Sequence, residues 1–195
     1  MKILYQGSPG AYSHLAALEI YPDTEVIACK TFDECFTKAK EDNKLKIIIP
    51  ESNRITGNIG IEYLMFKHRL NIFAEHFLQI EHNLLGLRGS KLEDVKNVFS
   101  HAQALSQCSN FIKKNKFIEN VHADTAGSAE LISISKKKSE AAIASKLSAK
   151  IYKLKIMGDC TSKPDTAQTI AIQKKAALAR RTTVSGRPQS VTTVD

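Results

Sequence analysis

Residues 95–108 read "VKNVFSHAQALSQC", a short apolar run followed by the beginning of an amphipathic stretch. The apolar run at 95–99 predicts a β-strand, and the amphipathic stretch at 102–114 predicts an α-helix. Ser100 and His101 stand where the predicted strand meets the predicted helix. A strand that leads directly into a helix is the repeating unit of α/β folds, so this stretch predicts an α/β protein.

The rest of the chain repeats this alternation of short apolar runs and helical periodicities. The runs that predict strands lie at 2–6, 24–29, 45–50, 95–100, 119–123 and 140–145. The periodicities that predict helices lie at 13–21, 31–42, 59–69, 102–114 and 126–135. The long alternating stretch at 70–89 predicts one or two extended strands that cross from one lobe to another. We therefore expect an α/β fold with mostly parallel sheets.

Composition and cysteine spacing limit the class of protein. The chain has 195 residues, of which 43% are hydrophobic, enough for one domain or two small lobes. No run approaches the roughly 18 apolar residues of a membrane helix, and the first ten residues break off too early for a signal peptide, so we expect a cytoplasmic protein without a membrane partner. The cysteines show neither CxxC nor zinc-ligand spacing, which favours reduced thiols and no metal site. They are Cys29, Cys35, Cys108 and Cys160.

The chain is basic, with a formal net charge of +8 and a pI near 9.3. Its lysines gather at 113–116, 135–140 and 146–155, and they are not interleaved with aromatic residues as in a stacking platform for nucleic acid. We therefore expect an anionic small-molecule partner and no nucleic acid, although nucleic-acid binding through this charge stays a weaker alternative. Residues 174–195 are rich in Thr, Ser and Arg and predict a poorly ordered tail.

Three stretches share the plan of a strand, a small polar turn and a helix start. They lie at 5–17, 99–105 and 122–131. A helix N-terminus presents backbone N–H donors and a partial positive charge, so three such turns along one crevice predict a site for a small anion. The alternative is that Ser13, Ser100 and Thr125 are ordinary helix caps, each worth about 1 kcal/mol.

These residues resemble the motifs of a known family. "GSPGAYSHLAA" (7–17) looks like the opening Gly-Pro-x-Gly-Thr-Tyr-Ser motif of the prephenate dehydratases, and "SHAQALSQC" (100–108) is similar to their Ser-His-x-Gln-Ala-Leu-x-Gln-Cys signature. The resemblance continues through 73–86, 124–132 and 141–157 and covers about residues 1–173. It implies a two-lobed fold like the type II periplasmic binding proteins, with a cleft between the lobes.

The resemblance also implies a domain organisation. The first lobe would hold about residues 1–75 and 160–173, and the second about residues 76–159. Family members usually pair, which implies a homodimer. The residues from 174 onward are too few for the ACT domain that follows in bacterial members, so feedback inhibition by phenylalanine is not expected.

The activity that the resemblance implies is the decarboxylating dehydration of prephenate to phenylpyruvate in phenylalanine biosynthesis. No cofactor is required. The reaction needs partners for two carboxylates, a proton donor for the leaving hydroxyl group and a desolvated carboxylate. The substrate contacts would come from the motif turns and from the "PESNRITG" stretch at 50–57, namely Gly10, Ala11, Tyr12, Ser13, Asn53, Arg54, Gly57, Ser100, His101, Gln103, Thr125, Ala126 and Gly127.

The sequence departs from the family pattern at its last strand. Where the family has Thr-Arg-Phe, this chain places Ala167, Gln168 and Thr169, and it has no arginine between Arg88 and Arg180. One interpretation is that Thr166 or Thr169 supplies the catalytic hydroxyl and Arg54 the missing guanidinium. The alternative is a catalytically impaired or inactive member that binds a small carboxylate without turnover.

Overall fold

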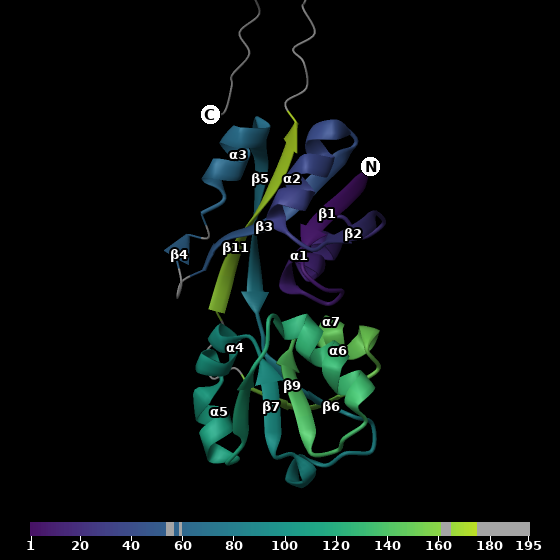
Figure 1. The fold of residues 1–195 in the computed structure, drawn as a ribbon, viewed down its shortest axis with the longest axis vertical. Helices are drawn as coiled ribbons and strands as arrows, with labels where there is room; N and C mark the ends of the chain where they lie inside the picture. Colours follow the sequence, from purple (N-terminus) through teal and green to yellow (C-terminus); the bar gives the residue numbers. More distant parts are fainter. Residues whose placement is uncertain (54–56, 59, 161–164, 175–195) are drawn as a thin grey trace, which may run out of the picture.

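The computed structural model describes residues 1–53, 57–58, 60–160 and 165–174. It contains two β-sheets, one above the other in Figure 1, each flanked by helices on both faces. The predicted two-lobed α/β fold is confirmed. Among the described residues, no helix is long and apolar enough to cross a membrane.

The first sheet contains the N-terminal strands and the last strand of the chain. Its order is β2-β1-β3-β11-β5, with the short strand β4 paired to β3. The bounds are β1 Lys2–Gln6, β2 Glu25–Cys29, β3 Leu45–Asn53, β4 Gly57–Asn58, β5 Leu70–Ile80 and β11 Asp165–Lys174. β5 is hydrogen-bonded to β11 along its whole length, so the predicted lobe boundary near residues 75–76 falls inside a strand of this sheet.

The second sheet has the order β10-β6-β9-β7-β8. Its bounds are β6 Asn83–Gly86, β7 Asn97–Ser100, β8 Ile118–Val121, β9 Glu140–Ala144 and β10 Lys155–Asp159. The chain enters this sheet through Glu81 and His82, between β5 and β6, and leaves it after β10. These two passages connect the lobes.

The sheets are mixed, which corrects the prediction that they are mostly parallel. β1 pairs in parallel with β2 and β3, and β7 with β8 and β9. The pairings β3–β11, β5–β11, β3–β4, β6–β9 and β6–β10 are antiparallel. The physical reason is that β11 returns from the second lobe and runs against its neighbours, a pairing between residues far apart in the chain that local patterns do not encode.

Helices cover both faces of each sheet and bury four apolar clusters. In the first lobe, α1 (Tyr12–Ile20) packs on one face, and α2 (Phe32–Glu41) and α3 (Glu62–His68) on the other. In the second lobe, α4 (Ala102–Gln107) and α5 (Ser109–Lys114) cover one face, and α6 (Thr125–Ser135) and α7 (Lys146–Ile151) the other. A short 3₁₀ helix, η1, spans Leu92–Asp94. Each lobe therefore has its own core.

The single helix predicted at 102–114 is two short helices in the structure. The chain turns at Cys108, whose backbone N–H bonds to the carbonyls of both Ala104 and Leu105. Ser109 and Asn110 follow directly, and both have lower helix propensity than the preceding Ala and Leu residues. All four cysteines are free and buried. The predicted tail lies outside the described residues except for Lys174, which ends β11.

Candidate active site

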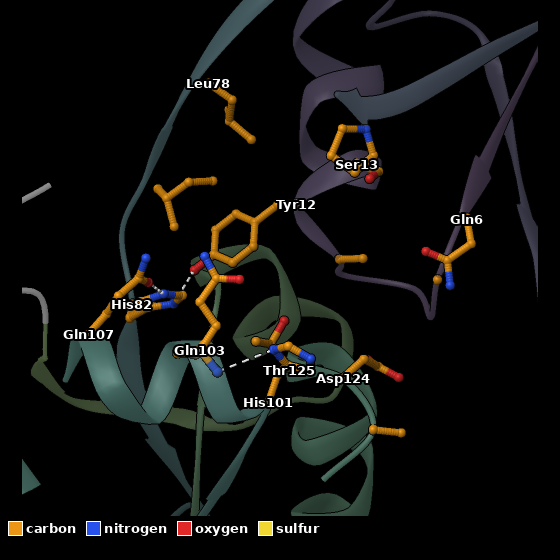
Figure 2. A pocket seen from close by; sticks show the side chains of 16 residues that line it. Gln6, Tyr12, Ser13, Leu78, His82, His101, Gln103, Gln107, Asp124 and Thr125 are labelled. Atoms are coloured by element: carbon orange, nitrogen blue, oxygen red, sulfur yellow. Dashed lines mark hydrogen bonds between the residues drawn. The ribbon is translucent and has the colours of Figure 1, made fainter. Parts of the chain in front are cut away.

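A cavity of about 370 Å³ lies between the two lobes. The lining residues come from the turns that precede α1, α4 and α6 and from the strand ends of the first sheet (Figure 2). They are Gln6, Gly7, Ala11, Tyr12, Ser13, Pro50, Leu78, Ile80, His82, His101, Gln103, Ala104, Gln107, Ala123, Asp124 and Thr125. The volume falls within the range of small-molecule sites.

The turn before α1 is held rigidly against the second lobe. Gly10 has a φ of 96°, and its buried carbonyl accepts hydrogen bonds from Ser145 Oγ at 2.7 Å and Ser148 Oγ at 3.0 Å. Its N–H donates to His14 Nδ1 at 3.1 Å. These bonds fix the start of α1 at the wall of the cavity.

The N-terminus of α1 carries no side-chain cap. Its N-cap residue is Ala11, and the first-turn N–H groups of a helix have no acceptor within the helix. Ala11, Tyr12 and Ser13 line the cavity, so this helix start can offer backbone donors to an anion.

Tyr12 and His82 connect the lobes at one end of the cavity. The Tyr12 hydroxyl lies 2.8 Å from the Glu81 carbonyl and 2.8 Å from His82 Nδ1. One hydroxyl has one proton, so Tyr12 donates either to the Glu81 carbonyl or to His82 Nδ1, and not to both. His82 Nε2 lies 2.6 Å from Gln107 Oε1. Burial raises the pKa of Tyr12 well above its ordinary value, with smaller contributions from Cys108, Cys160 and Glu81, so the hydroxyl stays protonated at neutral pH.

The turn between β7 and α4 contains one buried structural residue, Ser100, and leads into two residues that line the cavity, His101 and Gln103. Ser100 is fully buried, and its hydroxyl donates to the carbonyl of Ile143 in β9 at 2.6 Å. The N-cap of α4 is His101, whose Nδ1 lies 3.4 Å from the N–H of Gln103. His101 and Gln103 line the cavity, whereas Ser100 lies behind it.

The turn before α6 is capped by a carboxylate. Asp124 is the N-cap, and its Oδ1 accepts the N–H of Gly127 at 2.6 Å. Its Oδ2 lies 3.4 Å from the hydroxyl of Ser8, in the turn before α1. Asp124 and Thr125 line the cavity, and Ala126 and Gly127 do not.

The structure brings part of the predicted set together. Six predicted contacts line the cavity, namely Ala11, Tyr12, Ser13, His101, Gln103 and Thr125. Four do not line it: Gly10, Ser100 and Gly127 make hydrogen bonds behind the lining, and Ala126 is buried in α6. The backbones of Asn53 and Gly57 pair with each other where β3 meets β4, and Arg54 lies outside the described residues. The alternative that Ser13, Ser100 and Thr125 cap their helices is wrong, because Ala11, His101 and Asp124 hold the N-cap positions.

The predicted catalytic threonines lie on β11, between β3 and β5 in the first sheet. The backbone of Thr169 pairs with Pro50, which lines the cavity, and with His76. The backbone of Thr166 pairs with Gln79, which does not line it. Both positions therefore belong to the sheet that forms one wall of the site.

Sequence reasoning missed four polar residues of the cavity, namely Gln6 at the end of β1, His82, Gln107 and Asp124. His82 belongs to the motif-like stretch at 73–86, and this was the available signal. Gln107 follows Gln103 by four residues and so shares its helix face. Asp124 precedes a predicted helix start, where aspartate is a preferred cap.

A relative from Arabidopsis thaliana, arogenate dehydratase/prephenate dehydratase 1, chloroplastic, is 41% identical over 161 residues, which cover 82% of this chain and 41% of the relative. The chain spans about 40% of the length of the curated relatives it matches.

Two solved structures share the fold. GqqA, described as a novel type of quorum quenching acylase, has a TM-score of 0.86 and 30% identity, covering 91% of this chain and 65% of its own. The prephenate dehydratase of Staphylococcus aureus has a TM-score of 0.77 and 23% identity, covering 91% of this chain and 67% of its own. The model of the prephenate dehydratase family matches residues 3–177. The chain therefore belongs to the prephenate dehydratase family.

Proposed function

We propose that this chain catalyses the decarboxylating dehydration of the cyclohexadienol ring of prephenate, giving phenylpyruvate. The observation that carries the proposal is that the interlobe cavity is lined by residues of the family-like motifs at 7–17 and 100–108. Arogenate has the same ring and carries an amino group where prephenate has its side-chain keto oxygen. The same ring chemistry therefore applies to both compounds.

The reaction breaks two bonds and makes the ring aromatic. The bond from the ring to its carboxylate breaks and releases CO₂, and its electron pair enters the ring. The bond from the ring to the opposite hydroxyl group breaks, and that group takes up a proton and leaves as water. The site must therefore supply one proton donor and favour the loss of the carboxylate's charge.

The described residues suit these demands. The uncapped start of α1 can bind the side-chain carboxylate through the N–H groups of Tyr12 and Ser13. The apolar side chains of Leu78, Ile80 and Ala104 form part of the lining, where they would weaken the hydration of the ring carboxylate. A less hydrated carboxylate loses CO₂ more readily, because its charge disperses into the ring.

Thr169 is our choice for the proton donor. Its backbone pairs with Pro50, a lining residue. In the sequence it stands at the position of the family's phenylalanine, two residues after the position of the family's threonine. Thr166 is the matched comparison on the same strand. We expect Thr169→Val to lower kcat by about 10²- to 10⁴-fold, as for the loss of a general acid, and Thr166→Val to lower it much less.

A second candidate function is the binding of a small carboxylate without turnover. It is favoured by the sequence at the last strand, where Gln168 stands opposite the family arginine. The test is an assay of phenylpyruvate formation from prephenate, with the spontaneous conversion subtracted. Product above that background supports the dehydratase, whereas ligand-induced thermal stabilisation without product supports the binding protein.

A further inference from the structure

The charge of the cavity lining does not match a dianion such as prephenate. Of the sixteen described lining residues, Asp124 alone carries a formal charge when the histidines are neutral, and that charge is negative. A carboxylate in the wall repels a second carboxylate and attracts a cation. The charge therefore indicates that the preferred ligand has a positive group near Asp124.

The two helix starts from opposite lobes have opposite electrostatic character. α1 begins without a side-chain cap and offers backbone N–H donors, whereas α6 begins at the carboxylate of Asp124. The hydroxyl of Ser8, in the turn before α1, lies 3.4 Å from Asp124 Oδ2, so this turn and the start of α6 lie close together at one corner of the cavity. Donors for an anion, at Tyr12 and Ser13, and an acceptor for a cation, at Asp124, thus line the same cavity.

An α-amino acid group has this same pair of charges on adjacent atoms. Its carboxylate fits the N–H groups of α1, and its ammonium group fits a carboxylate acceptor such as Asp124. An α-keto acid offers the carboxylate but has only a neutral oxygen, itself an acceptor, at the second position. The corner therefore discriminates between the amino and the keto forms of one substrate.

We propose that Asp124 is a specificity-determining residue that binds the side-chain ammonium group of the substrate and so selects arogenate over prephenate. This inference rests on the proposed function, since both compounds undergo the same ring chemistry. Asp124 acts on substrate choice and not on the bond-breaking steps. The name of the Arabidopsis relative includes both arogenate and prephenate, so a choice between these two substrates arises in this family.

Asp124→Asn tests this role with little change in structure. Asparagine is as good an N-cap as aspartate and can still accept the Gly127 N–H, so the variant removes the charge and keeps the cap. We expect the ratio of kcat/KM for arogenate to kcat/KM for prephenate to fall by about 10- to 100-fold, because a charge-assisted pair is lost for one substrate only. Asp124→Ser, which also caps helices, serves as a second variant if the first fails to fold.

Asp94→Asn is the matched control. Asp94 is exposed, and its Oδ2 accepts the N–H of Lys91 at the start of η1, outside the cavity lining. It should leave the ratio unchanged. If Asp124→Asn or Asp124→Ser also leaves the ratio unchanged while the protein stays folded, the proposal is overturned.

Equilibrium binding separates this inference from the proposed function. If the wild-type protein turns over neither compound, the dehydratase proposal fails, and calorimetry with L-arogenate and prephenate decides the role of Asp124. Tighter binding of arogenate that is lost in Asp124→Asn would support the role. Equal binding of the two compounds by the wild-type protein would overturn it.

Discussion

The hydroxyl of Ser145 donates a 2.7 Å hydrogen bond to the carbonyl of Gly10, which joins the start of α7 in the second lobe to the turn before α1 in the first. Ser148 donates to the same carbonyl at 3.0 Å, and all three residues are buried. The two serines therefore hold the anion-binding end of α1 in place from the opposite lobe.

The two serines should be coupled in their effect on stability. Ser148→Ala removes one of two donors and should lower the free energy of unfolding by about 0.5–1 kcal/mol. Ser145→Ala also removes the cap of α7 and should lower it by about 1–2 kcal/mol. The double variant leaves the buried Gly10 carbonyl without either hydroxyl, so its loss should exceed the sum by about 1 kcal/mol or more in urea unfolding. Additive losses would contradict the shared-acceptor geometry.

Gly10→Ala should force the lobes apart. A Cβ at this position would lie 2.5 Å from Ser148 Oγ and 2.9 Å from Ser148 Cα, so the backbone of α7 would have to move. Gly89→Ala is the control, because Gly89 also has a positive φ but nothing within 4 Å of its added Cβ. We expect the control to lose about 1–2 kcal/mol from strain alone and Gly10→Ala about 1–3 kcal/mol more, with a raised KM. Equal melting temperatures for the two variants would show that the contact is unimportant.

Tyr12→Phe should loosen the connection between the lobes. The change removes the hydroxyl that meets both the Glu81 carbonyl and His82, so we expect a loss of about 1–2 kcal/mol in the free energy of unfolding and a lower kcat/KM. Tyr63→Phe is the control, because Tyr63 is 70% exposed on α3. Thermal melts and steady-state assays of both variants measure the difference, and no loss in Tyr12→Phe would argue against the network.

His14 should make the α1 turn sensitive to acid. Its Nδ1 accepts the Gly10 N–H, which requires that Nδ1 carry no proton. Burial lowers the pKa of His14 below the ordinary 6.5. In the unfolded chain His14 binds a proton as the pH falls through about 6.5, whereas in the folded protein it binds one only at a lower pH. The contribution of the neutral ring to the free energy of unfolding is therefore complete above pH 6.5 and is lost as the pH falls from there through the pKa of the folded state. Between about pH 7.5 and about pH 5.5, the wild-type melting temperature should therefore fall more than that of His14→Gln. Equal shifts would contradict this role.

Most elements of the fold could be predicted from local patterns, whereas α7, β10 and the pairing of the strands were not predicted. The strand at 95–100 and the helix at 126–135 follow from periodicities within ten residues. The antiparallel pairing of β11 with β3 joins residues more than 100 positions apart, for example Thr169 and Pro50. Only the folded sheet determines that register.

The candidate site divides in the same way. Ala11, Tyr12 and Ser13 could be predicted because a helix start after a strand is a local feature that binds anions. The role of His82 depends on Tyr12, 70 residues earlier, and the role of Asp124 depends on a cavity closed by the other lobe. The cytoplasmic location, the homodimer and the lack of a nucleic-acid partner stay predictions.

The most direct test of the dehydratase proposal is an assay of the purified protein with prephenate and with arogenate, following phenylpyruvate and phenylalanine. We predict both products above the spontaneous rate, with arogenate preferred and with Thr169→Val strongly impaired. Ligand-induced stabilisation by either compound without any product would contradict the proposal and assign the cavity to binding alone.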